Sequence, residues 1–209
     1  MNKYKKIVSI AATAVMCVAP MSVYAQEAQT DVIEAVAEKK QDTESSSVPV
    51  LQKEGIEISE GTGYDLSKEP GAATVKALEQ GTIVISYKTT SENAIQSLLS
   101  VGNGTKGNQD RHFHLYITNA GGVGMELRNT DGEFKYTLDC PAAVRGSYKG
   151  ERVSNTVALK ADKENKQYKL FANGELIATL DQEAFKFISD ITGVDNVMLG
   201  GTMRQGTVA

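Results

Sequence analysis

Residues 168–180 read YKLFANGELIATL, and this stretch decides the fold class. Apolar and polar side chains alternate on both sides of Asn173-Gly174, which is the spacing of half-buried strands. Asn-Gly is the preferred pair for a two-residue type I′ turn, because both residues tolerate positive φ. The stretch therefore predicts an antiparallel β-hairpin.

The chain keeps the same rhythm from Val48 onward. Short alternating apolar clusters are bounded by Gly, Asn, Asp or Pro, which is typical of strands and turns. Two segments depart from it: 73–78 fits either a strand or a helical turn, and 182–187 fits a short helix capped by Asp181. The pattern predicts an all-β protein, an antiparallel β-sandwich of jelly-roll type around one core. The other strands are expected at 48–51, 56–58, 81–88, 95–101, 113–117, 123–128, 134–138, 153–160 and 197–199.

The N-terminus has the pattern of an export signal. Three lysines precede the apolar run 7–18, and Val23-Tyr24-Ala25 supplies small residues where a signal peptidase reads. Cys17 suggests a lipoprotein, but Met16 is larger than the residue such a site normally carries before its cysteine. We therefore expect a signal peptide over 1–25, cleavage near Ala25 and a secreted or cell-surface protein.

The composition of residues 26–209 limits their class. Residues 26–47 are polar and acidic and predict a flexible linker, which leaves 48–209 as one module. Removing three lysines and no acids changes the formal net charge from -4 to -7, which disfavours nucleic acid as a partner. The run 7–18 is too short to insert stably across a membrane. Cys140 would be left alone, so stability must come from the core.

A second hairpin places charged groups on one face. Residues 113–128 read FHLYITNAGGVGMELR, with a short glycine-containing connection. If Ile117 lies opposite Val123, Tyr116 falls opposite Gly124 and His114 opposite Glu126. Glu126 and Arg128 then share the outer face of the sheet. Taken alone, these residues are most simply interpreted as an ordinary solvent-exposed ion pair.

Other candidate sites have simpler explanations. His112 and His114 could ligate a metal, but a polar outer face explains them without a third ligand. Asp110 and the turn 131–133 could hold Ca²⁺, although a plain turn is the simpler interpretation. Cys140 has no evident base beside it and is expected to be a buried, inert thiol. No cofactor is therefore expected.

Three motifs in order resemble a known family. The run 168–180 followed by 197–204 (VMLGGTMR) resembles the concanavalin-like lectin sandwich. The ordered set 95–101 (IQSLLSV), 125–128 (MELR) and 199–204 (LGGTMR) more narrowly resembles the sialic-acid-binding module, carbohydrate-binding module family 40, that precedes the catalytic domain of bacterial sialidases. The similarity covers roughly 50–209.

The resemblance implies a ligand site. Glu126 and Arg128 match the glutamate and arginine that the family uses on one strand, and Arg204 matches a later arginine. Ile95 matches an apolar residue that takes the acetamido methyl, and Tyr116 an aromatic residue beside the sugar. The chemistry is reasonable, because a planar guanidinium binds a carboxylate through two parallel hydrogen bonds.

The resemblance also implies what surrounds this module. Family members continue past the position of Ala209 with a strand that closes the sandwich, followed by a sialidase catalytic domain. The partners expected are sialylated, mucin-type glycoconjugates. The chain has neither the Arg-Ile-Pro motif nor the aspartate boxes of sialidase catalytic domains, nor any tryptophan, so we expect binding without catalysis.

Two alternatives stay open from the sequence. One is a concanavalin-like module that binds a neutral glycan or a protein, which would not need Arg128 and Arg204 to converge. The other is an enzyme whose catalytic part lies beyond Ala209, which is compatible with a binding module that serves it.

Overall fold

The computed structural model describes residues 12–17, 49–59, 61–89, 95–118, 120–129, 134–141, 154–204 and 207–208. For β1, the first two residues of β2, and Arg204, it describes the backbone alone. The expected linker, the cleavage site, the turn 131–133 and the loop 142–153 lie outside the described residues. The helical elements are α1 (Ala72–Lys76) and a 3-10 turn, η1 (Ile188–Asp190). The strands are β1 (Ala12–Cys17), β2 (Pro49–Ile56), β3 (Tyr64–Asp65), β4 (Gly81–Tyr87), β5 (Ile95–Gly102), β6 (His112–Thr118), β7 (Val123–Asn129), β8 (Phe134–Cys140), β9 (Asn155–Asp162), β10 (Gln167–Ala172), β11 (Glu175–Asp181), β12 (Asn196–Leu199), β13 (Met203–Arg204) and β14 (Thr207–Val208).

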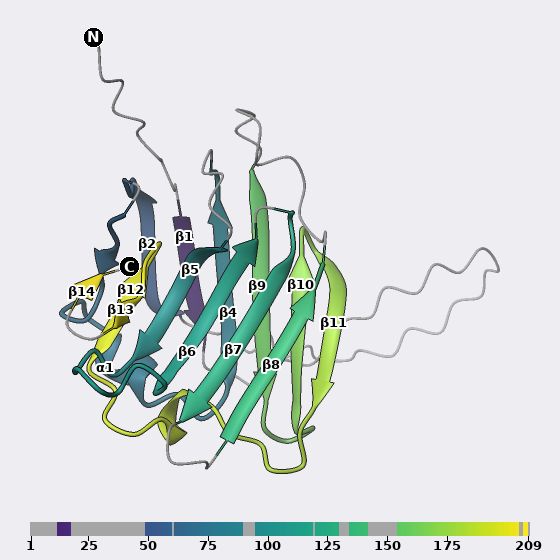
Figure 1. Ribbon diagram of the computed structural model, residues 1–209. Helices are drawn as coiled ribbons and strands as arrows, with labels where there is room; N and C mark the ends of the chain where they lie inside the picture. The colour runs from purple at the N-terminus through teal and green to yellow at the C-terminus, as the bar shows by residue number, and fades with distance from the viewer. Residues whose placement is uncertain are drawn as a thin grey trace, which may run out of the picture.

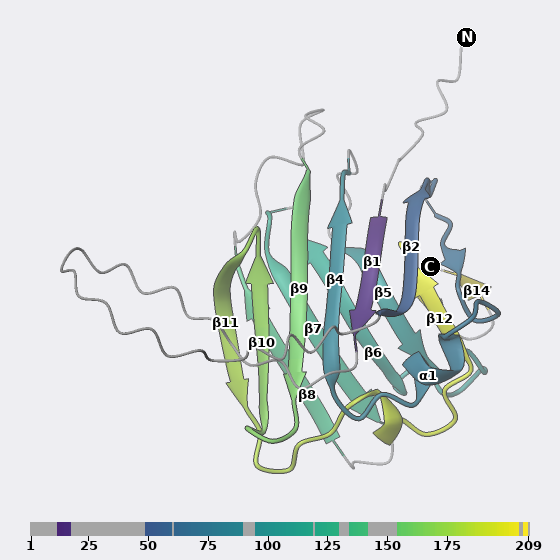
Figure 2. The same ribbon diagram turned by 180° about the vertical axis from the view of Figure 1, so that it is seen from behind.

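The strands form two packed sheets, as the sequence predicted. Sheet A has the order β11-β10-β9-β4-β1-β2, and sheet B has the order β3-β12-β5-β6-β7-β8. All of their pairings are antiparallel. Figure 1 shows sheet B in front of sheet A, and Figure 2 shows sheet A from behind. The prediction of an antiparallel β-sandwich is confirmed.

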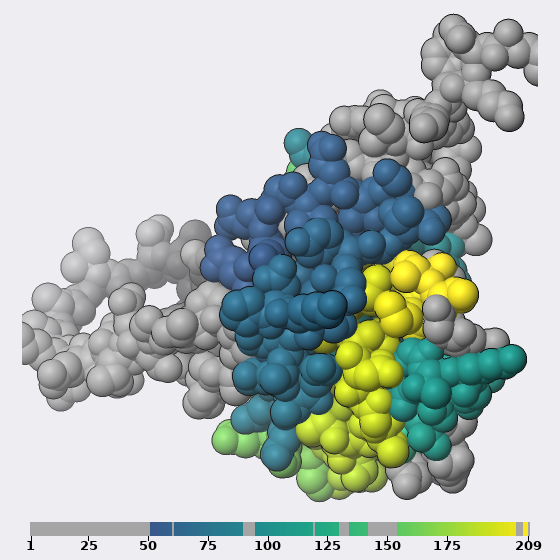
Figure 3. All heavy atoms as spheres, turned by 90° about the vertical axis from the view of Figure 1, so that its left-hand side faces the viewer, coloured from purple at the N-terminus to yellow at the C-terminus, as the bar shows by residue number. Residues whose placement is uncertain are grey.

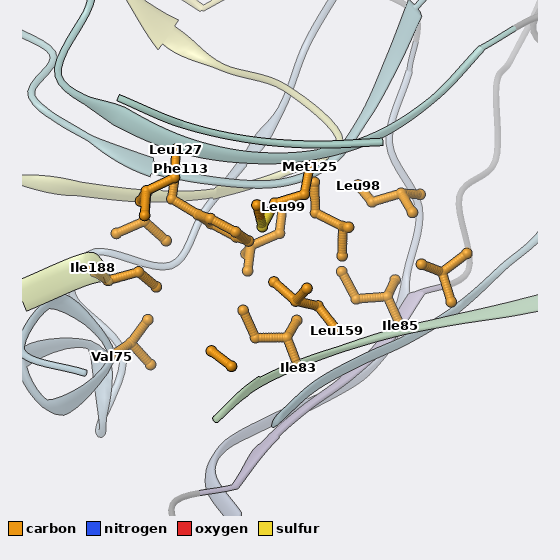
Figure 4. Close-up of a cluster of buried hydrophobic side chains, with 14 of the residues drawn as sticks. Val75, Ile83, Ile85, Leu98, Leu99, Phe113, Met125, Leu127, Leu159 and Ile188 are labelled. Atoms are coloured by element: carbon orange, nitrogen blue, oxygen red, sulfur yellow. The ribbon is translucent and has the colours of Figure 1, made fainter. Parts of the chain in front are cut away.

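The core lies between the two sheets. Every second residue of β4 is buried, and the inward residues of β6 and β7 are fully buried, because strand side chains alternate between faces. Figure 4 shows Ile83, Ile85 and Leu159 of sheet A facing Leu99 and Met125 of sheet B. The other faces of these strands are left for solvent or a ligand.

The hairpin at 168–180 has the predicted turn. Asn173 and Gly174 both have positive φ, at 52° and 89°. Ala172 pairs with Glu175, and the register shifts once further down the ladder, between Leu170 and Phe171. Turn chemistry and strand period therefore determined this hairpin locally.

The prediction of a helix over 182–187 is wrong. The Tyr136 hydroxyl donates to the Ala184 carbonyl, and the Tyr168 hydroxyl donates to the Lys186 carbonyl. The Phe185 ring stacks on the Tyr168 ring at 4.9 Å between centroids. Contacts with tyrosines of both sheets thus replace the internal hydrogen bonds of a helix, and a 3-10 turn follows only at η1. At 73–78, where strand and helical turn were both open, the chain forms α1.

The position of β1 was not foreseen. This strand lies inside the apolar run expected to be a signal sequence, yet it pairs with β2 on one side and with β4 on the other. Figure 2 shows it between these two strands. Among the described residues, the structure contains no helix long and apolar enough to cross a membrane.

Candidate functional site

Strands β6 and β7 have the register that the sequence predicted. Tyr116 lies opposite Gly124, His114 opposite Glu126, and Ile117 opposite Val123. The turn that fixes this register has the Gly121 amide donating to the Thr118 carbonyl, with Gly121 at a φ of 78°. The outer face of sheet B, which faces the viewer in Figure 1, therefore carries Tyr116, Glu126 and Arg128 in neighbouring positions.

Arg128 is held by two carboxylates. Its Nη2 lies 3.0 Å from Asp110 Oδ1, and its Nη1 lies 3.2 Å from Glu126 Oε1. The side chains of Arg128 and Glu126 are only 27% and 20% exposed, so the pair is more buried than an ordinary surface ion pair. Asp110 lies near the end of the loop between β5 and β6, where the sequence has no strand period. The sequence suggested it only as a Ca²⁺ ligand.

Glu126 is the charge centre of the site. Besides Arg128, it lies 3.4 Å from His112 Nε2 and 4.0 Å from Lys135 Nζ. The hydrogen bond with His112, together with the charges of Arg128 and Lys135, lowers the pKa of Glu126 to about 2. Glu126 therefore stays ionised and can accept hydrogen bonds at any physiological pH.

The two histidines lie beside the site on β6, opposite Arg128 and Glu126. Both are buried. The His112 Nδ1 interacts with the Gln109 carbonyl at 2.9 Å, and the His114 ring lies 5.0 Å from the Tyr116 ring. Within the described residues, no group of three His, Cys, Asp or Glu side chains is arranged to hold a metal ion.

Tyr116 reaches across β7 to β8. Its hydroxyl donates to Asp139 Oδ1 at 2.5 Å, and its ring passes over Gly124. Asp139 was not among the predicted site residues. The alternation of β8, with Phe134, Tyr136 and Leu138 buried, could have placed Asp139 on the outer face, but not opposite Gly124.

Ile95 begins β5 on the same outer face. It lies opposite Thr118, and Ser97 lies opposite Tyr116, which makes Ile95 a diagonal neighbour of Tyr116. Ile95 is 59% exposed, which is unusual for a large apolar side chain in this structure. An exposed apolar group beside polar ones suits the apolar part of a mixed ligand.

The segment before Arg204 lies across the outer face of β5. The Ser97 and Ser100 hydroxyls both donate to the Gly201 carbonyl, at 3.1 and 3.2 Å. Further on, a Cβ placed at Gly104 would lie 3.1 Å from Met203 Cγ. In Figure 3 the yellow C-terminal residues lie between blue residues from early in the module and a teal segment from its middle.

Arg204 follows Met203 directly on β13. Gly102 pairs with His112, and His112 pairs with Arg128, so the end of β5 beside Met203 is also the end that faces Arg128 across β6. Four of the five predicted residues, Ile95, Tyr116, Glu126 and Arg128, therefore lie on one face of sheet B, and Arg204 lies on β13. Their roles in binding stay predictions.

Cys140 lies apart from this chemistry. It closes β8 opposite Val123 and is partly exposed, rather than buried as expected. A thiol at a strand end, with Pro141 after it, is only partly covered by the sandwich. The described site therefore offers a guanidinium, several hydrogen-bond acceptors and an apolar side chain.

Comparisons with known proteins agree with this geometry. The anhydrosialidase of Macrobdella decora is 64% identical over 194 residues, which cover 90% of this chain and 26% of that protein. The solved Ruminococcus gnavus IT-sialidase CBM40 bound to alpha2,3 sialyllactose is 97% identical, with a TM-score of 0.73 over 77% of this chain and 84% of that one. A leech intramolecular trans-sialidase complexed with 2,7-anhydro-Neu5Ac is 71% identical, with a TM-score of 0.74 over 77% of this chain and 24% of that one.

The chain spans about a quarter of the length of the Macrobdella decora relative. The family model described as "Sialidase, N-terminal domain" matches residues 33–209, which is most of the chain. The protein therefore belongs to the sialidase N-terminal domain family and contains a carbohydrate-binding module of family 40.

Proposed function

We propose that this chain is a non-catalytic module that binds terminal sialic acid on host glycoconjugates. The observation that carries the proposal is the Arg128 guanidinium, held in place by Asp110 and Glu126 on an outer sheet face beside Tyr116. Arg128 and Arg204 would grip the sugar carboxylate, and Glu126 would accept from an N-H or a hydroxyl. Ile95 would cover the acetamido methyl. The 97% identical module bound to alpha2,3 sialyllactose supports this assignment.

The module would serve a sialidase. The relatives that it matches are several times longer, and the family model takes its name from the N-terminal domain of sialidases. We infer that a catalytic domain follows this module and that the module holds it on sialylated, mucin-type surfaces. Export, with cleavage near Ala25, is part of the same proposal, and N-terminal sequencing of secreted protein should begin at Gln26.

The direct test is a pair of ligands that differ only in sialic acid. Titration of the chain with α2,3-sialyllactose should give a dissociation constant of about 0.1 to 10 mM, because a small polar ligand on an open sheet face desolvates little surface. Lactose should not bind over the same range. Equal binding of both sugars would instead favour a module for neutral glycans.

Catalysis by this chain is tested separately. We expect the purified chain to release no sialic acid from a fluorogenic sialoside above the buffer rate, because the chain lacks the Arg-Ile-Pro motif and the aspartate boxes of sialidase catalytic domains. Retention on mucin would then reflect many weak contacts at high local ligand density rather than one strong site. Turnover that tracks protein concentration would contradict the non-catalytic assignment.

A further inference from the structure

The Tyr116 side chain is held in place by contacts with residues of three strands. The His114 ring lies 5.0 Å from its ring on one side, and Asp139 binds its hydroxyl on the other. Gly124, directly opposite on β7, lies beneath the ring. Three strands therefore contribute to the position of one side chain.

Gly124 is required for space and not for backbone conformation. Its φ is not in the left-handed region, so any residue could adopt its backbone. A Cβ placed there would lie 2.5 Å from Tyr116 Cε2, and closer still to Asp139 Oδ1. Any other residue would push both side chains away from their present positions, since real Cβ atoms do not approach so closely.

The hydrogen bond with Asp139 determines what Tyr116 can offer. A phenol has one proton and lone pairs on its oxygen, whereas an ionised carboxylate only accepts. The Tyr116 proton is therefore donated to Asp139, and the phenol oxygen retains only acceptor capacity. Burial, together with the hydrogen bond to Asp139, raises the pKa of Tyr116, so the proton stays on the phenol.

We propose that Gly124 and Asp139 are positioning residues that hold Tyr116 over β7 as a hydrogen-bond acceptor. This inference rests on the proposed function, in which Tyr116 lies beside the ligand. The Tyr116 oxygen can then accept a hydrogen bond from a ligand hydroxyl or N-H group, but it cannot donate one to a ligand carboxylate. The carboxylate binds instead to Arg128, which donates. Gly124 and Arg128 are four residues apart on β7, or about 13 Å. Tyr116 thus adds an acceptor at a distance from the Arg128 guanidinium, which favours one orientation of a sialylated glycan.

A double-mutant cycle tests the role of Asp139. Binding of α2,3-sialyllactose is measured for Tyr116→Phe, Asp139→Ala and the double variant. We expect each single change to weaken binding by about 3- to 10-fold, the size of one net hydrogen bond. The double variant should bind like Tyr116→Phe, because Asp139 has no hydroxyl left to position. Asp139→Asn should retain most of the affinity, since its amide oxygen still accepts.

Controls distinguish the positioning of Tyr116 by Asp139 from a non-specific effect of removing a carboxylate. Glu79, an exposed carboxylate that pairs with Lys163, provides the matched variant Glu79→Ala, which should bind like the wild type. The Cζ resonance of labelled Tyr116 should titrate at lower pH in Asp139→Ala, because the hydrogen bond and the charge of Asp139, which both raise the Tyr116 pKa, are lost. Wild-type affinity in Asp139→Ala, or losses that multiply in the double variant, would overturn the role of Asp139.

Gly124→Ala tests the space beneath the ring. We expect at least a 10-fold loss of affinity in a protein whose unfolding remains cooperative, because the added methyl displaces Tyr116. If this variant does not fold, the double-mutant cycle of Tyr116→Phe and Asp139→Ala tests the positioning of Tyr116 by itself. Arg128→Ala distinguishes the proposed sialic-acid site from the positioning role of Gly124 and Asp139. If Arg128→Ala loses binding while Asp139→Ala and Gly124→Ala bind like the wild type, only the positioning role is refuted. Unchanged binding in Arg128→Ala refutes the site itself.

Discussion

At the scale of residues, Arg128 is oriented before any ligand arrives. Two carboxylates, from Asp110 and Glu126, fix the guanidinium plane by charge-assisted hydrogen bonds. Because the Arg128 side chain is already ordered, it loses less conformational entropy when a ligand binds. It also means that specificity rests on the geometry of the guanidinium, since the local charge is largely balanced.

Substitution of Arg128 should therefore affect binding more than stability. Arg128→Ala is expected to lose about 2 to 4 kcal/mol of apparent affinity, which abolishes detectable millimolar binding. Arg128→Lys should fail nearly as badly, because an ammonium lacks the planar fork. Stability should fall by only about 1 kcal/mol, as Asp110 and Glu126 lose a shared partner. Calorimetric titration with α2,3-sialyllactose and thermal unfolding measure the two effects.

Glu126→Gln is the milder comparison for the same site. Its amide oxygen still accepts from the ligand, so binding should be weakened but measurable. The ranking of the three variants is the informative result. Sialoside binding at wild-type strength in Arg128→Ala would show that this ion pair is only a surface feature.

The low pKa of Glu126 makes stability depend on pH. The group has an ordinary pKa of 4.5 and a folded pKa of about 2, so its stabilising effect is complete above pH 4.5 and is lost as pH falls towards 2. Glu126→Gln should be less stable than the wild type at pH 6, and the difference should shrink to nothing near pH 2. Urea unfolding across this range measures it. A difference that does not change with pH would contradict the assignment.

Asp162 provides a control away from the site. Burial acts to raise its pKa, but hydrogen bonds from Asn165 and the ion pair with Lys160 bring it to about 2, from an ordinary value of 3.8. Asp162→Asn should therefore show its loss of stability over a window that begins at lower pH than that of Glu126. Its sialoside binding should equal that of the wild type.

At the scale of elements, the β10–β11 hairpin depends on its turn. Asn173 also ties the turn to β9, since its Oδ1 accepts from the Thr156 amide at 2.9 Å and its Nδ2 donates to Asn155 Oδ1 at 3.1 Å. The hairpin is thus attached to sheet A at its tip as well as along β10. These bonds hold the tip of the hairpin against β9, although β11 lies at the edge of the sheet.

Gly174→Ala should destabilise the protein through the backbone alone. Gly174 has a φ of 89°, and no atom lies within 4 Å of a Cβ placed there. The cost of a left-handed residue predicts a loss of about 1 to 2 kcal/mol in urea unfolding. Gly174→Asn is the matched control and should cost less, because asparagine tolerates this region. Equal losses for both variants would point to a cause other than φ.

At the scale of the whole molecule, sheet A depends on β1. This strand completes the ladders of β2 and β4, yet it belongs to the segment that we propose is cleaved. Removal of residues 1–25 leaves two strands facing an empty position in the sheet.

A protein of residues 26–209 should therefore be weakened on one side. We expect faster amide hydrogen exchange in β2, which loses its partner in sheet A, and in those amides of β4 that pair with β1. The unfolding temperature should also fall. Exchange in β6 and β7 of sheet B provides the internal control and should stay slow. Full protection of β2 and β4 in this protein would show that the two strands pair without β1.

The sequence by itself determined whatever depends on local period and turn chemistry. Alternation gave the strands, Asn173-Gly174 gave one hairpin, and the short turn at Gly121 set the register that puts Tyr116 opposite Gly124. Side chains two residues apart on a strand share a face, so the sequence alone places Glu126 and Arg128 next to each other. Those features are decided within about a dozen residues, and the structure confirms them.

Only the tertiary structure decided what depends on contacts between distant segments. It brought Asp110 to Arg128 and Asp139 to Tyr116, and it drew 182–187 towards two tyrosines instead of into a helix. It also placed β1 between β2 and β4. No local period encodes these outcomes, because the order of strands in a sheet and the path of a loop follow from how the whole chain buries its apolar faces.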